Sequence, residues 1–284
     1  MIQKSIQHPK LKEQFHALES YIEEISSIAT DFFYSANTQN TKKHDGTVVT
    51  EIDTSIESKL RAYIKENFPG DTIIGEEDAD HIGTTDFHWH IDPIDGTDNF
   101  LRRIPFFAIS VARLGDDPHG SFAIVYNPIS KQRFSTFTEE LGNVFENEMI
   151  CQLDPEPLGT KYVISLARVG KESWMKPAGY KIQEKLGQKY GRCGAMNCAS
   201  LELSYLAANR VDGFITFGHS SYDYAAGVFL AKSAGASISI FEGEAWKPWD
   251  SSIKELCNVK DRIMFVSHKD THQMFLKDIG NPKE

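Results

Sequence analysis

The amino-acid sequence predicts an α/β protein, with an α+β N-terminal part at residues 1–150 and an α/β C-terminal part at residues 151–284. Two helical patterns come first, a run of short strand patterns follows, and strands and helices then alternate. Consecutive short strands separated by turns form antiparallel sheets, whereas strand–helix alternation is typical of α/β lobes. The composition, with 40% hydrophobic and 25% charged residues, is that of a globular chain long enough to bury a large core.

The N-terminal part begins with two amphipathic helices. Apolar residues recur at steps of three and four over residues 8–36, and again from Thr50 to about Asn67, where Pro69 and Gly70 end the pattern. Turns rich in Gly, Asp and Asn-Pro then separate six expected strands: Thr72–Gly75, Trp89–Ile91, Phe106–Leu114, Ser121–Tyr126, Arg133–Phe137 and Asn143–Phe145. This order predicts a largely antiparallel sheet behind two helices.

The C-terminal part alternates strands and helices. Strands are expected at Tyr162–Leu166, Val211–Phe217, Ser237–Phe241 and Ile263–Ser267. Helices are expected at Lys171–Gln188, Ala199–Asn209 and Asp223–Ala234, although Pro177 and Gly179 interrupt the first of them. The boundary between the two parts is expected within Glu148–Thr160.

The charge balance excludes some classes of partner. With 40 acidic and 30 basic residues the net charge is −10, which disfavours binding to nucleic acid polymers or to anionic membranes. Apolar stretches fall well short of the roughly 18–20 residues of a spanning helix, and the N-terminus lacks the apolar region of a signal peptide. The four cysteines form no CxxC pair. We therefore expect a cytoplasmic protein with reduced thiols.

The segment Trp89–Phe100, WHIDPIDGTDNF, carries the most chemistry in the sequence. A strand pattern delivers Asp92 at its C-terminal end, where the sites of α/β proteins usually lie. Pro93 cannot continue a hydrogen-bonded ladder, so we expect the chain to turn there and bring Asp95 to the same point. With the Ile94 carbonyl, these oxygens form the kind of cluster that binds hard cations, Mg²⁺ foremost.

The residues that follow suit a phosphate group. Gly96 permits a close backbone approach, and its amide and that of Thr97 can face an anion. A helix beginning at Thr97–Leu101 would add the attraction of its N-terminus. The alternative is that Asp-Pro and Asp-Gly occur here only as turn formers.

The complete string resembles the signature of the inositol monophosphatase family, the lithium-sensitive, magnesium-dependent phosphatases: Trp-x-Ile-Asp-Pro-Ile-Asp-Gly-Thr-x-Asn-Phe. Its ending, Thr97–Phe100, differs from the Lys-Gly-Phe form typical of nucleotide-phosphatase relatives. The resemblance implies a layered αβαβα sandwich, Mg²⁺-dependent hydrolysis of a phosphate ester, and a homodimer.

A second match lies upstream. Lys43–Asp53 is similar to the family's Lys-x-Asp-x-x-x-Val-Thr-x-x-Asp. By position alone, Thr50 and Asp53 form a capping box, and Asp53 would only cap the second helix. The resemblance implies that Asp53 lies beside Thr97, where the pair orients the attacking water, and the two roles are compatible. It also implies that Lys43 lies close to a third, weaker ion.

Two further matches complete the expected carboxylate set. Gly75-Glu76-Glu77 follows a strand pattern, and Tyr222–Gly227 resembles the family's Trp-Asp-x-Ala-Ala-Gly. Without the resemblance, Glu76 would be a solvated side chain and Asp223 a helix cap. The resemblance implies that Glu76 ligates metal and helps to hold the water, and that Asp223 closes a second metal site.

The positions that would contact the substrate differ from the family pattern. Inositol phosphatases carry a Glu seven residues before the C-terminal Asp, where it hydrogen-bonds the sugar hydroxyls; this chain has Thr216. The family's Gly-Ser-x-Ala-Leu stretch appears as Asn197–Leu201, which puts Cys198 and Ala199 in substrate-binding positions. Tyr222 in place of Trp is a mild change. The reaction is therefore better supported than the substrate.

Other constellations are weak. His88 and His90 flank Trp89 and would point to one face, but without a third ligand we favour polar surface residues over a zinc pair. No base accompanies Cys198, which favours an inert buried thiol. The sequence contains neither GxGxxG nor a P-loop.

Taken residue by residue, the resemblance implies two metal ions and a third, weaker one. Glu76, Asp92 and the Ile94 carbonyl would hold the first, and Asp92, Asp95 and Asp223 the second. The substrate would contact a set drawn from both parts of the chain: Asp95, Gly96, Thr97, Cys198, Ala199 and Thr216.

The expected function is Mg²⁺-dependent hydrolysis of a small phosphate ester, such as inositol monophosphate, by a metal-activated water. Histidinol phosphate, fructose bisphosphate and phosphoadenosine nucleotides are alternative substrates within the superfamily. A non-catalytic family member acting as a binding or regulatory protein is the alternative from another class. Loss of a ligand carboxylate would favour it, and none is lost.

Overall fold

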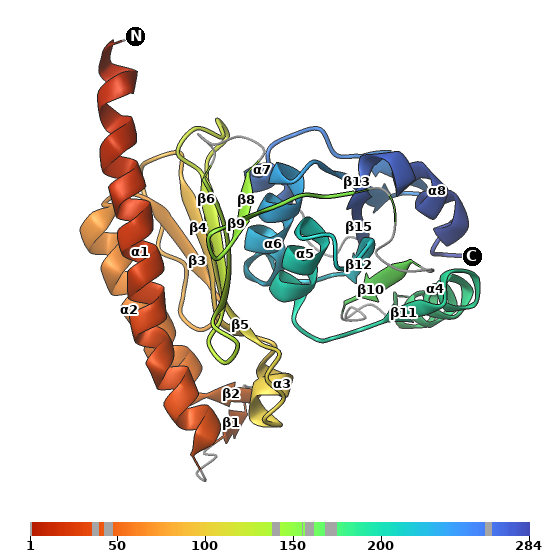
Figure 1. Ribbon diagram of the computed structural model, residues 1–284, viewed down its shortest axis with the longest axis horizontal. Helices are drawn as coiled ribbons and strands as arrows, with labels where there is room; N and C mark the ends of the chain where they lie inside the picture. Colours follow the sequence, from red (N-terminus) through yellow and green to blue (C-terminus); the bar gives the residue numbers. More distant parts are fainter. Residues whose placement is uncertain are drawn as a thin grey trace.

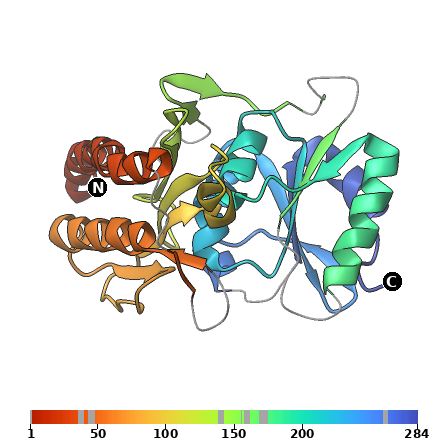
Figure 2. The ribbon, with the colours of Figure 1, turned by 90° about the horizontal axis from the view of Figure 1, so that it is seen from below.

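Five layers stack in the order helix, sheet, helix, sheet, helix (Figures 1 and 2). The computed structural model describes residues 2–35, 40–42, 48–137, 143–154, 156, 162–167, 175–258 and 263–284. The layers confirm the expected αβαβα sandwich. No helix within these residues combines the length and the hydropathy that crossing a membrane requires.

Helices α1 (Ile2–Tyr34) and α2 (Glu51–Asn67) form the first outer layer, as expected from their periodicity. Their apolar faces bury Leu18, Ile22, Ile56 and Leu60 completely against the first sheet. Helix α1 begins earlier than the expected residue 8 and runs through Pro9. A short hairpin, β1 (Asn40–Lys42) and β2 (Val48–Thr50), connects the two helices.

The first sheet has seven strands in sequential order, and only its first pair, β3 with β4, is parallel. It is the largely antiparallel sheet expected. The strands are β3 (Thr72–Gly75), β4 (His88–Asp95), β5 (Ala108–Leu114), β6 (Phe122–Asn127), β7 (Gln132–Phe137), β8 (Val144–Glu146) and β9 (Met149–Cys151). Strand β9 was not expected from the sequence.

Strand β4 corrects one expectation. The sequence predicted a strand over Trp89–Ile91 and a turn at Pro93, but β4 continues to Asp95. Its register with β5 shifts, because Asp92 faces Ser110 whereas Asp95 faces Ala108. Three steps along β4 match two steps along β5, so β4 contains one extra residue, as in a β-bulge. Proline is tolerated at such a place.

The middle layer consists of α5 (Ala199–Ala207) and α6 (Ser221–Ser233), packed between the two sheets (Figure 1). Gly227 of α6 allows the close contact between the two helices, because a Cβ there would lie 2.6 Å from Cβ of Leu203. The sequence predicted both helices to within two residues of their ends. This layer joins the first sheet to the second.

The second sheet has six strands in the order β11-β10-β12-β15-β13-β14. Strands β10, β11 and β12 run parallel, and β15 and β13 pair antiparallel. The bounds are β10 (Val163–Leu166), β11 (Arg192–Gly194), β12 (Gly213–Phe217), β13 (Ala236–Glu242), β14 (Ala245–Pro248) and β15 (Ile263–His268). Of these, β11 and β14 were not expected.

Helices α4 (Met175–Tyr190) and α8 (Lys269–Ile279) cover the outer face of the second sheet. Helix α4 accommodates Pro177 because this residue lies in its first turn, where the missing N–H needs no partner. Residues 171–174, the expected start of this helix, lie outside the described residues. Helix α8 and the short α7 (Ile253–Cys257) were not expected, although α8 buries Phe275, Leu276 and Ile279 at helical spacing.

Candidate metal and phosphate site

The extra residue in β4 brings two carboxylates together. Side chains three residues apart in a regular strand point to opposite faces, and one extra residue returns them to the same side. Asp92 and Asp95 are 1% and 7% exposed. Asp92 Oδ1 accepts a hydrogen bond from the Ile94 amide at 3.0 Å, which stabilises the bulged backbone.

The chain turns after Asp95 through Gly96, whose φ of 90° favours glycine. A Cβ here would also lie 3.0 Å from the Asn197 carbonyl oxygen and 3.2 Å from Cβ of Cys198. The five-residue helix α3 (Thr97–Leu101) begins at the next residue, as the sequence suggested. Thr97 Oγ1 donates to the Ile94 carbonyl at 3.0 Å, so the hydroxyl and this carbonyl, both predicted site groups, touch.

Asp95 connects β4 to the middle layer. Its Oδ2 accepts hydrogen bonds from the Ser200 amide at 2.6 Å and from Cys198 Sγ at 3.2 Å. Burial raises the pKa of Asp95, and the hydrogen bonds from Ser200, Cys198 and Ala199 oppose that rise. The start of α5 therefore fixes the orientation of this carboxylate.

Three more carboxylates approach from other elements. Asp53 on α2 is buried, Glu76 follows β3 and is half-buried, and Asp223 lies in the first turn of α6. Asp223 Oδ2 accepts a hydrogen bond from the Ser220 amide at 2.9 Å, so this side chain is the N3 member of a capping box whose N-cap is Ser220. The capping role considered for Asp223 is thus present.

The electrostatics show that the five carboxylates share one region. Burial raises the pKa of Asp92 well above its usual range, and the charges of Glu76, Asp95, Asp223 and Asp53 raise it further. In the part of the chain described, however, no three His, Cys, Asp or Glu side chains stand close enough to ligate one ion. Each of the other four carboxylates is near enough to repel Asp92, but among the described residues no three of them meet at a common ligating point.

The remaining predicted residues within the described part of the chain belong to β12 and to the start of α5. Thr216 is 2% exposed near the end of β12, and its hydroxyl hydrogen-bonds Nδ1 of His219. Cys198 and Ala199 are buried at the start of α5. Burial raises the pKa of the Cys198 thiol well above its usual range, as expected for an inert thiol. Lys43 lies outside the described residues.

The histidines flanking Trp89 correct another expectation. His90 is buried, not a surface residue, and its Nδ1 lies 2.9 Å from Ser221 Oγ. Burial lowers its pKa to about 3. His88 is half-buried. The strand pattern could not reveal this, because the middle layer that covers His90 comes from a distant part of the sequence.

Two polar groups that sequence reasoning missed support the site. Asn99 Nδ2 donates to the carbonyls of Phe106 at 2.8 Å and Met196 at 2.7 Å, and so ties α3 to the loop before α5. Glu57 and Arg61 form a buried ion pair on α2. Their spacing of four residues on a helix face that also carries buried apolar residues was a signal for such a pair.

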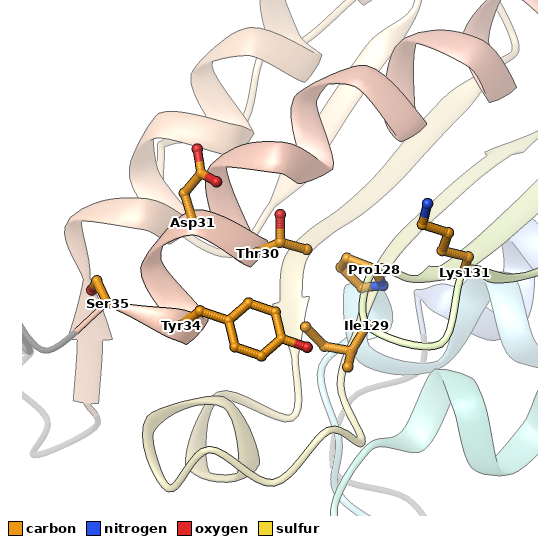
Figure 3. A pocket seen from close by; sticks show the side chains of 7 residues that line it. All are labelled: Thr30, Asp31, Tyr34, Ser35, Pro128, Ile129 and Lys131. Carbon is orange, nitrogen blue, oxygen red and sulfur yellow. The ribbon is translucent and has the colours of Figure 1, made fainter.

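Two surface cavities lie elsewhere. One, of about 480 Å³, is lined by the end of α1 and the β6–β7 turn, with Asp31, Tyr34 and Lys131 as its ionisable residues (Figure 3). The other, of about 430 Å³, lies between α1 and β7 beside Glu19 and Arg133. Neither is lined by a residue of the carboxylate cluster.

Comparisons with known proteins show which family and which fold the chain resembles. A model of the inositol monophosphatase family matches residues 10–282. The Nus factor SuhB of Salmonella typhimurium is 33% identical over 207 residues, 71% of this chain and 75% of that protein. The extragenic suppressor protein suhB of Bartonella henselae has the same fold, with a TM-score of 0.78 at 21% identity over 94% of this chain and 98% of that one. An IMPase/NADP phosphatase complexed with Mg²⁺ and phosphate has a TM-score of 0.75 at 18% identity over 95% of each chain.

Proposed function

The chain belongs to the inositol monophosphatase family, and from this premise we propose that it is a Mg²⁺-dependent phosphomonoesterase acting on a small phosphate ester. The observation that supports the proposal is the bulge in β4, which turns the buried carboxylates of Asp92 and Asp95 to one side. The charges of Glu76, Asp223 and Asp53 act on Asp92 from other elements. Buried like charges destabilise one another unless a cation offsets them. A purely structural cluster would gain nothing from this repulsion.

The donor set fits magnesium. It consists of carboxylate oxygens and one backbone carbonyl, without thiolate or imidazole, which are the ligands that hard cations prefer. We assign one ion to Glu76, Asp92 and the Ile94 carbonyl, and a second to Asp92, Asp95 and Asp223, whose carboxylates would have to move closer together than they stand here to share it. A third, weaker ion near Glu76 belongs to the same proposal. When bound, Mg²⁺ lowers the pKa of a water molecule and neutralises phosphate charge.

The chain's own groups orient the reactants. We assign the phosphate oxygens to the backbone amides of Gly96 and Thr97 at the turn into α3. The Thr97 proton is engaged by the Ile94 carbonyl, so the lone pairs of Oγ1 remain free to accept from a water. Asp53 accepts a second hydrogen bond from that water, and together with Thr97 it orients the water for in-line attack. Positioning and electrostatics supply the catalysis, and no phosphoenzyme is expected.

The substrate is a small phosphorylated molecule, with inositol monophosphate as the reference compound. Asp95, Gly96 and Thr97 would contact its phosphate end, and the loop at Cys198–Ala199 and the end of β12 at Thr216 would surround its other end. Histidinol phosphate, fructose bisphosphate and phosphoadenosine nucleotides remain alternatives. A homodimer and a cytoplasmic location are part of the proposal and rest on family membership; light scattering of the purified protein tests the first.

A second candidate function is a non-catalytic binding or regulatory role. The observation that favours it is the 33% identity to a protein named Nus factor SuhB, which is not the name of an enzyme. Retention of every predicted ligand carboxylate favours the phosphatase instead.

The deciding experiment is phosphate release from a panel of monoesters, measured with Mg²⁺ and with excess chelator. We expect hydrolysis of at least one ester with Mg²⁺ and its collapse on chelation. Asp92→Asn should abolish it, whereas Asp98→Asn, which changes an exposed carboxylate of α3, should not. A folded protein that hydrolyses no ester would favour the second candidate, and full activity in chelator would exclude the metal mechanism.

A further inference from the structure

We propose that Glu57 and Arg61 are positioning residues, which fix Glu76 for metal binding through a buried clamp on the turn after β3. The inference rests on the proposed phosphatase function and names residues that none of the family motifs includes. Glu57 is fully buried and Arg61 is 6% exposed. The Arg61 Nε lies 2.7 Å from Glu57 Oε1.

Both side chains of the ion pair also form hydrogen bonds with the backbone that follows Glu76. Glu57 Oε2 accepts from the Glu77 amide at 2.8 Å, and Oε1 accepts from the Asp78 amide at 3.0 Å. The Arg61 guanidinium donates to the carbonyls of Asp78 at 2.9 Å and Ala79 at 3.2 Å. Five hydrogen bonds from two side chains, including the one between them, therefore fix the three residues that follow Glu76.

Gly75 shows how closely the clamp approaches the strand end. A Cβ at this position would lie 2.4 Å from Glu57 Oε1 and 2.7 Å from Arg61 Nη2. Any larger residue at position 75 would collide with the Glu57 carboxylate, which explains the glycine directly before Glu76. The clamp therefore packs against the residue before Glu76 and hydrogen-bonds to the residue after it.

The clamp also relates Glu76 to Asp53. Asp53, Glu57 and Arg61 follow one another at steps of four along α2 and are all buried, so they form a polar stripe beside Ile56, Leu60 and Ile64. One rigid helix therefore carries Asp53 and, through the clamp, sets the backbone of Glu76. Loosening the clamp should displace Glu76 without removing any ligand.

The test compares two buried ion pairs at opposite ends of β3. Glu57→Gln keeps the size of the side chain but replaces one accepting oxygen with a donor. Asp71→Asn is the matched control, because Asp71 is 3% exposed and lies 2.7 Å from Arg113 Nε, before the start of β3. Both variants should lower Tm. Their response to Mg²⁺ should differ.

For Glu57→Gln we expect the Mg²⁺ concentration for half-maximal phosphate release to rise at least tenfold, with kcat recovering substantially at saturating Mg²⁺. The rise in Tm on adding a fixed Mg²⁺ concentration should shrink, and this readout needs no substrate. Asp71→Asn should retain the wild-type values of both quantities. Equal Mg²⁺ responses in the two variants would overturn the proposal.

If Glu57→Gln does not fold, Arg61→Lys decides. Lysine keeps the charge beside Glu57 but cannot also reach both carbonyls as the guanidinium fork does. A weaker shift in the same direction supports the clamp, and a wild-type Mg²⁺ response overturns it. If the wild-type protein itself shows neither Mg²⁺-dependent hydrolysis nor a Mg²⁺-induced rise in Tm, the proposed function fails before any variant is compared.

Discussion

At the residue scale, the carboxylates of the candidate site are tied to structural contacts. Asp223 caps α6 through the Ser220 amide, Asp95 accepts from the start of α5, and Asp92 braces the bulge through the Ile94 amide. A substitution that removes such a side chain would therefore confuse a structural effect with a chemical one. Variants that keep the hydrogen bond and change only the charge separate the two.

Asp223→Asn is such a variant. Asparagine keeps an oxygen that can accept from the Ser220 amide, so the capping box survives and Tm should change by no more than a few degrees. The negative charge is lost, and a neutral amide would hold the second metal far more weakly. We expect kcat to fall by orders of magnitude, with partial recovery at high Mg²⁺. A kcat within a few-fold of wild type at low millimolar Mg²⁺ would remove Asp223 from the site.

Thr216 should make the protein a poor catalyst for inositol monophosphate. A hydroxyl engaged with His219 cannot provide the charge-assisted hydrogen bond of a carboxylate, which contributes about 1.5–3 kcal/mol. Thr216→Glu should lower KM for this ester by roughly tenfold or more, from the same energy. Thr216→Gln controls for side-chain size. The argument is wrong if the wild type already prefers inositol monophosphate strongly over the other esters.

At the scale of elements, the sequence predicted what depends on local patterns. The two N-terminal helices, six strands of the first sheet, and α5 and α6 follow from periodicity and turn residues. The register shift at Pro93 could not be predicted, because a bulge is defined only against its partner β5. The burial of His90 depends on α6, which lies more than a hundred residues away in the sequence.

The candidate site likewise contains residues that a local sequence pattern reveals and contacts that it does not reveal. Asp92, Asp95, Gly96 and Thr97 could be found in one short segment, because the bulge in β4 and the turn at Gly96 follow each other directly. The contact of Asp95 with Ser200 and the clamp of Glu57 and Arg61 on the turn after β3 join distant segments. No local pattern specifies such pairs. Helix α8 is a different case, since its apolar spacing was present in the sequence and was missed.

Helix α5 carries a buried glutamate, Glu202, that should make the stability of the protein depend on pH. Glu202 is fully buried and accepts a hydrogen bond from the Met196 amide. Burial, with a smaller effect from the charge of Asp95, raises its pKa to about 8. The folded state thus holds a proton that the unfolded state releases near pH 4.5. The contribution of Glu202 to the free energy of unfolding is therefore fully present below pH 4.5 and is lost as the pH rises towards 8.

Glu202→Gln should remove this dependence, because glutamine keeps an accepting oxygen and stays neutral. Relative to the variant, the wild type should lose about 1.4 kcal/mol of unfolding free energy per pH unit between pH 5 and 8. Denaturant titrations of both proteins across this range measure the difference. Parallel curves for the two proteins would show that Glu202 does not titrate in this way.

At the scale of the whole molecule, the candidate site draws on layers that come from separate stretches of sequence. Asp53, Glu76, Asp92 and Asp95 come from the first sheet and its helices, whereas Asp223 comes from α6 of the middle layer. Only the stacking of the layers brings them together. A ligand that binds this cluster must therefore stabilise the packing of the first sheet against the middle layer.

Magnesium should accordingly stabilise the complete fold. A ligand that binds only the native state at a concentration 100-fold above its Kd adds about 2.7 kcal/mol. For a chain of this size that corresponds to a rise in Tm of roughly 5 °C, and the rise should grow with the logarithm of Mg²⁺ concentration.

Because the cluster needs α6 as well as β4, hydrogen exchange should slow in both elements when Mg²⁺ is added. Asp223→Asn should lose the protection in α6 first. Calorimetry and hydrogen exchange are each measured with and without Mg²⁺. A NaCl solution of equal ionic strength, free of divalent cations, is the control for a general salt effect. An unchanged Tm at Mg²⁺ concentrations that saturate activity would mean that the ion does not bind the folded protein through this cluster.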